Sequence, residues 1–139
     1  MKKLLSFWIS FVILFSGSCF AMQPSVIGGV RDGLAIGFMA DGPLSNNIGI
    51  RFGLEANSGK QPLVAFLGSK FYLANVGRSL MSFGLGVVAY AGGSKNAEIG
   101  GAFSMIFNRV ANIVPLFFEI GVDVAGTSRA QAQLGFKIF

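Results

Sequence analysis

Hydrophobic and polar residues alternate with a period of two in the stretch 47–57. The odd-numbered positions hold asparagine, glycine or a charged residue, and the even-numbered ones are Ile48, Ile50, Phe52, Leu54 and Ala56. Successive side chains of a β-strand point to opposite faces, so this period is typical of a strand whose two faces meet different surroundings. The stretch is therefore predicted to be a strand with one apolar face.

The same alternation recurs along the chain and predicts about eight strands joined by tight turns rich in Gly, Asn, Asp and Ser. The predicted strands span residues 26–30, 34–40, 47–57, 62–74, 79–92, 98–107, 114–124 and 130–139. Asp32-Gly33 is a tight-hairpin signal that splits 26–40 into two strands, although one longer strand with a bulge is the alternative. Pro115 lacks a backbone donor and is expected at a bulge or at a strand start.

The composition is unusual for a soluble domain. Hydrophobic residues make up 53% of the chain and charged residues only 12%, against about 25% charged residues in typical soluble domains. After residue 21, however, no apolar run reaches the roughly 18–20 residues that a membrane helix needs. Every backbone amide in lipid must be hydrogen-bonded, so the remaining membrane-spanning structure is a closed β-barrel. We therefore expect an all-β, antiparallel, up-and-down transmembrane barrel.

Residues 1–21 have the features of a signal peptide: two lysines, an apolar run, and small residues leading to a cut after Ala21. The barrel domain would then be 22–139. A short N-terminal membrane anchor is the alternative for this segment. Cys19, the only cysteine, is either discarded with the signal peptide or lipid-modified.

The two faces of the predicted strands differ in content. From the second strand onward, the apolar faces carry no polar side chain except Ser69. The opposite faces combine small residues with seven charged ones, namely Arg51, Glu55, Lys70, Glu98, Glu119, Asp123 and Lys137. An eight-stranded barrel has room inside only for packed side chains, so these charges are predicted to form a polar network in the lumen. The inverse arrangement, a soluble lipocalin-like barrel with the apolar faces inward, is the alternative.

Over residues 26–139 the chain resembles the small eight-stranded outer-membrane barrels of Gram-negative bacteria, the OmpA/OmpX-like class. The resemblance rests on the alternation, the signal peptide and the terminal aromatic Phe139, and no family-specific motif supports it. It implies insertion into outer-membrane lipid and recognition of Phe139 by the barrel-assembly machinery. The alternating apolar residues Leu134, Phe136 and Ile138 run one position out of phase with Phe139, which departs from the pattern of that class.

Two groups of charged residues are candidates for chemistry. Glu98, Glu119 and Asp123 could form a proton or cation site, although a salt-bridged interior is the favoured interpretation. Lys60, Lys95 and Arg129 are predicted at one rim, where they would either contact lipopolysaccharide phosphates or be ordinary solvated residues.

Enzymatic activity is not expected. The chain has no histidine, the commonest general base and metal ligand. The segment 84–89 matches the GxGxxA pattern of dinucleotide-binding proteins but lacks the following helix and acidic residue. No cofactor or metal is expected, and the small basic excess without an aromatic–basic cluster does not indicate nucleic-acid binding. We expect an integral outer-membrane barrel with a structural or surface role; a narrow pore for small solutes and a soluble periplasmic lipid-binding barrel are the alternatives.

Overall fold

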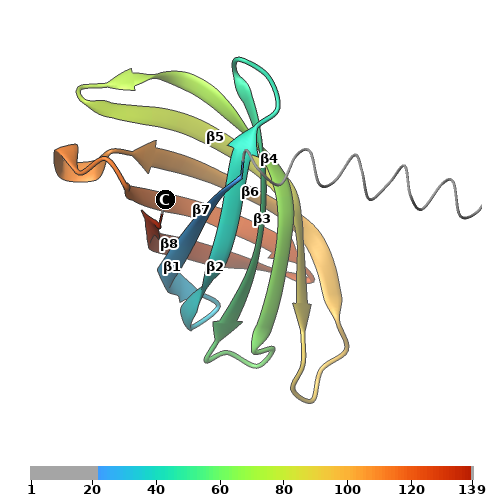
Figure 1. Cartoon of the computed structure of the whole chain (residues 1–139). Helices are drawn as coiled ribbons and strands as arrows, with labels where there is room; N and C mark the ends of the chain where they lie inside the picture. The colour runs from blue at the N-terminus through green and yellow to red at the C-terminus, as the bar shows by residue number, and fades with distance from the viewer. Residues whose placement is uncertain (1–21, 139) are drawn as a thin grey trace, which may run out of the picture.

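The computed structural model describes residues 22–138. The predicted signal peptide, the possible lipidation of Cys19 and the predicted assembly signal at Phe139 lie outside this range. Within it, the chain forms a closed antiparallel barrel in which each strand pairs with the next and β1 pairs with β8 (Figure 1). The eight strands are β1 (Gln23–Arg31), β2 (Leu34–Pro43), β3 (Ile48–Asn57), β4 (Leu63–Val76), β5 (Ser79–Ala91), β6 (Glu98–Asn108), β7 (Leu116–Ala125) and β8 (Thr127–Lys137).

The predicted all-β, eight-stranded, up-and-down topology is confirmed. Residues 26–40 form two strands, because Asp32 and Gly33 adopt the positive φ angles (59° and 137°) that close a tight turn. Pro115 directly precedes β7, the strand-start position expected for a residue without a backbone donor. The only helical segment among the described residues is the short 3-10 turn η1 (Val110–Asn112). None of the helices in this part of the chain has the length and apolar character needed to cross a membrane.

Several strands extend beyond their predicted limits, and the extensions of β1, β2 and β8 matter for the interior. The sequence places Arg31, Asp41 and Arg129 in turns because glycine and other turn-forming residues adjoin them. In the structure, the backbone ladder continues through all three residues: Arg31 pairs with Gln131, Asp41 with Arg51, and Arg129 with Asp123. The turns are consequently only one to a few residues long at these places, and all three side chains gain positions on the barrel wall.

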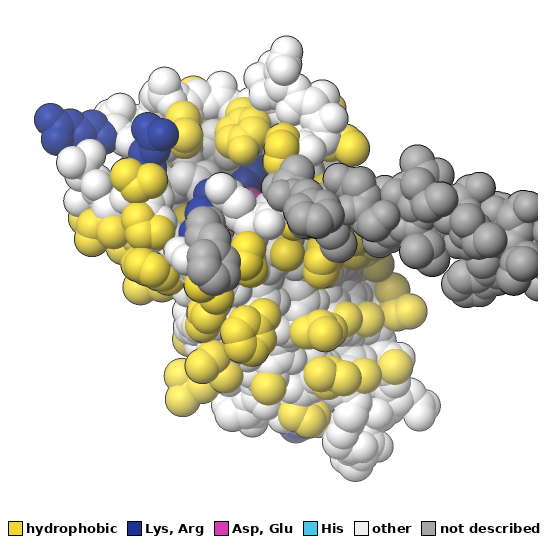
Figure 2. All heavy atoms as spheres, viewed as in Figure 1, with side chains coloured by type: hydrophobic (Ala, Val, Ile, Leu, Met, Phe, Trp, Pro, Cys, Tyr) yellow, Lys and Arg dark blue, Asp and Glu magenta, His cyan; other side chains and the backbone are white. Residues whose placement is uncertain are grey.

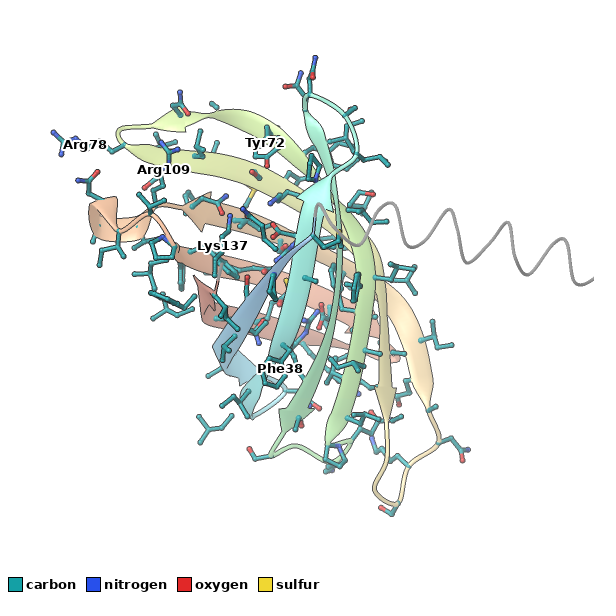
Figure 3. The ribbon with its side chains drawn as sticks, in the orientation of Figure 1. Phe38, Tyr72, Arg78, Arg109 and Lys137 are labelled. Carbon is teal, nitrogen blue, oxygen red and sulfur yellow. The ribbon has the colours of Figure 1, made fainter. Side chains whose placement is uncertain are left out.

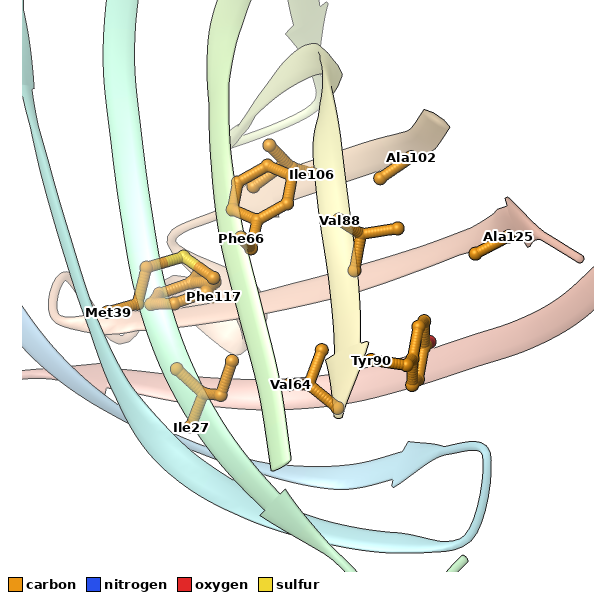
Figure 4. Packing of buried hydrophobic residues seen from close by; sticks show 10 residues of the cluster. All are labelled: Ile27, Met39, Val64, Phe66, Val88, Tyr90, Ala102, Ile106, Phe117 and Ala125. Carbon is orange, nitrogen blue, oxygen red and sulfur yellow. The ribbon is translucent and has the colours of Figure 1, made fainter. Parts of the chain in front are cut away.

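Apolar side chains cover the outside of the barrel, in the bands visible in Figure 2. On β2, for example, Ile36 and Phe38 are 65% and 68% exposed, whereas the alternate residue Met39 is only 4% exposed. The interior contains its own apolar cluster (Figure 4), made of Ile27, Met39, Val64, Phe66, Val88, Tyr90, Ala102, Ile106, Phe117 and Ala125. Buried charged residues share that interior.

The two ends of the barrel differ. One end, termed here the N/C end, holds the start of β1, the finish of β8 and the connections 44–47, 77–78 and 109–115. At this end, the β4–β5 hairpin extends beyond its neighbours (Figure 1). The other end, termed the distal end, holds the β1–β2, β3–β4, β5–β6 and β7–β8 turns. The charged side chains described next are distributed between these ends.

Candidate functional site: the interior ion-pair network

Arg31 is the centre of the interior ion-pair network. Its side chain is 1% exposed and bridges β3 and β7, which lie two strands away from β1 in the two directions around the barrel. Nη1 donates to Glu55 Oε1 on β3 at 2.6 Å, while Nε and Nη2 donate to the two carboxylate oxygens of Asp123 on β7 at 2.7 and 3.0 Å. This bidentate arrangement is the strong form of an arginine–carboxylate pair. One cation thus neutralises part of the charge of two buried acids.

Neutral side chains supply the remaining hydrogen bonds to these acids. Tyr90 Oη donates to Asp123 Oδ2 at 2.5 Å, and Gln133 Nε2 donates to Glu55 Oε2 at 2.5 Å. Gln131 Nε2 lies 3.4 Å from Asp123 Oδ1. Buried carboxylates are tolerated when they are both paired and hydrogen-bonded, and residues from five strands combine here to meet that requirement.

A second ion pair joins Arg51 on β3 to Glu119 on β7. Two guanidinium nitrogens donate to the two carboxylate oxygens at 3.1 and 2.6 Å, and both side chains are at most 3% exposed. The guanidinium carbons of Arg31 and Arg51 lie 5.5 and 5.7 Å from the centre of the Phe66 ring. Both distances are within the range of cation–π attraction, so the aromatic ring links the two arginine clusters.

An ion pair also lies toward each end of the barrel. Near the N/C end, Lys70 on β4 is paired with Asp41 on β2. At the distal end, Arg129 on β8 donates to Glu98 at 2.6 Å, and its Nε lies 3.6 Å from Asp32. The interior is therefore crossed by ion pairs from one mouth to the other.

Arg129 is also held by neutral neighbours. Its Nη2 donates to Gln61 Oε1 at 2.9 Å, and its guanidinium carbon lies 3.9 Å from the centre of the Tyr90 ring. The side chain is 6% exposed. The prediction that Arg129 belongs to a solvated rim with Lys60 and Lys95 is therefore wrong for Arg129: it lies at the same end as the two lysines but points inward.

The network uses every acidic residue of the chain. The six acids are Asp32, Asp41, Glu55, Glu98, Glu119 and Asp123, and each is within 4.0 Å of Arg31, Arg51, Lys70 or Arg129. The five basic residues of 22–138 outside these pairs are Lys60, Arg78, Lys95, Arg109 and Lys137. The charges that remain outside the network are consequently all positive.

Six of the seven charged residues expected in the lumen lie in these ion pairs, namely Arg51, Glu55, Lys70, Glu98, Glu119 and Asp123. Lys137 is instead half-buried at the N/C end, where it lines a cavity. The sequence analysis missed Arg31, Asp41 and Arg129. The sequence did contain a signal for these three residues, because each lies an even number of positions from the inward-facing residues of its strand. Arg129, for example, is followed at intervals of two by the inward-facing Gln131 and Gln133.

The three acids proposed as a proton or cation site are not gathered as free ligands. Glu98, Glu119 and Asp123 are each bound by a different arginine. Across residues 22–138, no group of three or more Asp, Glu, His or Cys side chains is arranged to hold a metal ion. The segment 84–89 lies within β5 and is followed by the turn to β6, so the helix that a dinucleotide site requires is not there.

After comparison with known proteins, only the architecture of the barrel remains as a basis for likening this chain to other proteins. No protein-family model matches the chain, and no characterised protein or solved structure is significantly similar to it. The likeness to small eight-stranded barrels therefore concerns strand number, closure and topology.

Proposed function

We propose that this chain is an integral outer-membrane β-barrel protein with a structural or surface role, whose lumen is closed by ion pairs. The observation that carries the proposal is the distribution of side chains between the two faces of the wall. Large apolar residues such as Leu34, Ile36 and Phe38 are more than 60% exposed, whereas Arg31 and Arg51 are 1% exposed.

This distribution suits a barrel surrounded by lipid. Monomeric soluble proteins rarely expose contiguous apolar patches larger than a few hundred Å², and they seldom bury most of their charge. In a bilayer the same apolar side chains meet acyl chains. The closed ladder leaves no open sheet edge to lipid, which is the condition for a membrane-spanning sheet.

The content of the lumen supports a structural role over transport. The Arg31 and Arg51 clusters join β1, β3 and β7 across the interior, and Phe66 packs between these charges. Small barrels of eight strands are filled by their own side chains. A narrow pore for small solutes is the alternative, and it requires these ion pairs to separate.

The other alternative is a soluble lipocalin-like barrel that binds a lipid inside. Such a barrel needs an apolar cavity for the acyl chain. Here the centre of the barrel holds the buried side chains of Arg31, Glu55 and Asp123, which would lose their solvation or pairing beside an acyl chain. This arrangement favours the membrane proposal.

Cell fractionation and gel migration test the proposal together. The protein is expected in the outer-membrane fraction, and unheated samples should migrate differently from boiled ones, because a closed barrel resists unfolding by detergent at room temperature. Recovery of the folded protein in the soluble periplasmic fraction would contradict the proposal and favour the lipocalin-like alternative.

A further inference from the structure

Two adjoining cavities open at the N/C end of the barrel. The first has a volume of about 330 Å³ and lies over the mouth, between Tyr72, Arg109 and Lys137. The second, of about 320 Å³, lies between the β4–β5 tip at Arg78 and the β6–β7 connection. Arg109 lines both cavities, and so do two apolar residues, Leu80 and Val114. Figure 3 shows Arg78, Arg109 and Lys137 on this side of the molecule.

The charged side chains that line these cavities, those of Arg78, Arg109 and Lys137, are all basic. All six acids of the chain are engaged by Arg31, Arg51, Lys70 and Arg129. No described acid lies within 4.0 Å of the basic groups of Arg78, Arg109 or Lys137. Dark blue side chains accordingly stand out on the left of Figure 2, whereas no magenta accompanies them there. A positively charged lining of this kind suits an anionic ligand.

The backbone around Arg109 adopts an uncommon conformation. Arg109, Ala111 and Asn112 have positive φ angles of 59°, 52° and 64°. Left-handed backbone is infrequent for residues other than glycine and clusters at ligand-binding and other functional sites. This backbone conformation places Arg109 at the boundary between the two cavities. The guanidinium of Arg109 is therefore available to a ligand in either cavity.

From this geometry we infer that the two cavities form a binding site for a phosphate group carried by a small polar molecule. Guanidinium groups donate in a fork that matches phosphate oxygens, and lysine adds a mobile positive charge. Asn108 and Tyr72 offer neutral hydrogen-bonding groups, while Leu80 and Val114 offer apolar contact to the rest of the ligand. The combined volume suits a headgroup-sized molecule.

Two sources supply this chemistry: the headgroup of an anionic phospholipid, or a free phosphate ester. The phospholipid source rests on the proposed membrane insertion, because it requires the N/C end to lie at a bilayer surface. Binding of a free phosphate ester does not depend on membrane insertion. Binding of either compound supports the site. Which of the two compounds binds identifies the source of the phosphate group.

The test uses the full chain, purified in dodecyl maltoside, and two probes. One is glycerol 1-phosphate, titrated by calorimetry; the other is phosphatidylglycerol in mixed micelles, with phosphatidylcholine as the zwitterionic comparison. We expect at least one anionic probe to bind, with phosphatidylglycerol retained over phosphatidylcholine if the lipid is the ligand. R78Q/R109Q should weaken that binding at least tenfold.

The matched control is K60Q/K95Q, which removes two exposed positive charges from the distal end. Its affinity should equal that of the unmodified chain. V114E, which places a carboxylate in the site without removing an arginine, should also abolish binding and guards against misfolding of the double variant. Failure of both probes to bind, or an equal loss in K60Q/K95Q, would overturn the inference. A soluble, folded chain that still binds glycerol 1-phosphate would refute the membrane proposal alone.

Discussion

At the scale of single residues, the buried arginines determine what the interior tolerates. Arg31 contacts two carboxylates through three nitrogen atoms, and Tyr90 and Gln133 complete the shell. A buried pair of this kind is weak evidence of net stabilisation, because desolvation offsets the Coulomb attraction. Removing one partner is different, because the other charge then remains buried without compensation.

Replacement of Arg31 by Gln should therefore lower the free energy of unfolding by about 3–5 kcal/mol, the usual cost of breaking a buried pair. Urea titration of the folded barrel in detergent, followed by circular dichroism, measures this change. R78Q removes an exposed arginine and should stay within about 0.5 kcal/mol of the unmodified chain. Equal effects of the two substitutions would mean that Arg31 is not buried in an ion pair.

Arg129 and Lys60 provide a second comparison, because both lie at the distal end. Arg129 contacts Glu98, Gln61 and the Tyr90 ring, whereas Lys60 is exposed. R129Q should destabilise the barrel by about 1–3 kcal/mol through loss of charged hydrogen bonds, and K60Q should have almost no effect. The same urea titration decides between this outcome and a solvated Arg129, for which the two variants would be indistinguishable.

At the scale of the strand, alternation is a strong guide to which residues face inward, since a shift by one residue would turn every side chain to the other face. It correctly assigned Arg51, Glu55 and Asp123 to the less apolar face of their strands. It failed at strand ends, where turn-forming residues next to Asp41 and Arg129 suggested that the ladder had stopped. The alternation of inward and outward side chains continues through turn-forming residues when they lie at the end of a strand.

Strand coiling depends on glycine at particular inward positions. A Cβ added to Gly121 on β7 would lie 2.1 Å from the carbonyl oxygen of Phe103 and 2.8 Å from the Cα of Ser104 on β6. Both contacts are with backbone, which cannot move aside as a side chain would. The close approach of β6 and β7 therefore requires glycine at this position.

G121A should consequently destabilise the barrel by about 1–3 kcal/mol, the usual cost of overpacking. Gly28 on β1 is the matched control, because a Cβ there would meet only the Ala35 carbonyl oxygen, at 3.6 Å. G28A should be neutral or nearly so in the same denaturation experiment. A destabilisation by G28A as large as that by G121A would contradict this view of the β6–β7 contact.

At the scale of the whole molecule, the strand number follows from the sequence because the alternation repeats, and closure was predicted because no apolar run after residue 21 is long enough for a membrane helix. The partners inside the barrel do not follow from it. Arg31 and Asp123 are 92 positions apart, and their meeting depends on the tilt and register of the closed sheet. The cavities at Arg109 were equally unpredictable, since they arise from the spatial approach of the β4–β5 hairpin to the β6–β7 connection.

The closed lumen leads to a prediction about ion flow. In planar bilayers the unmodified chain should show little single-channel conductance, because the Arg51–Glu119 pair and its neighbours occupy the axis. R51A/E119A removes both charges and bulk from the centre and should raise conductance several-fold, whereas K60A/K95A should not. High conductance of the unmodified chain would favour the narrow-pore alternative.

The side of the wall that meets lipid can be measured directly with a spin label. In a chain carrying C19S, a label at Phe38→Cys reports on a position that is 68% exposed on the outside of β2, and a label at Lys95→Cys reports on an exposed turn. In bilayer vesicles, the Phe38 label should be relaxed strongly by oxygen and weakly by a water-soluble nickel complex, and the Lys95 label should show the reverse. Strong relaxation of the Phe38 label by the nickel complex would contradict a membrane-inserted barrel.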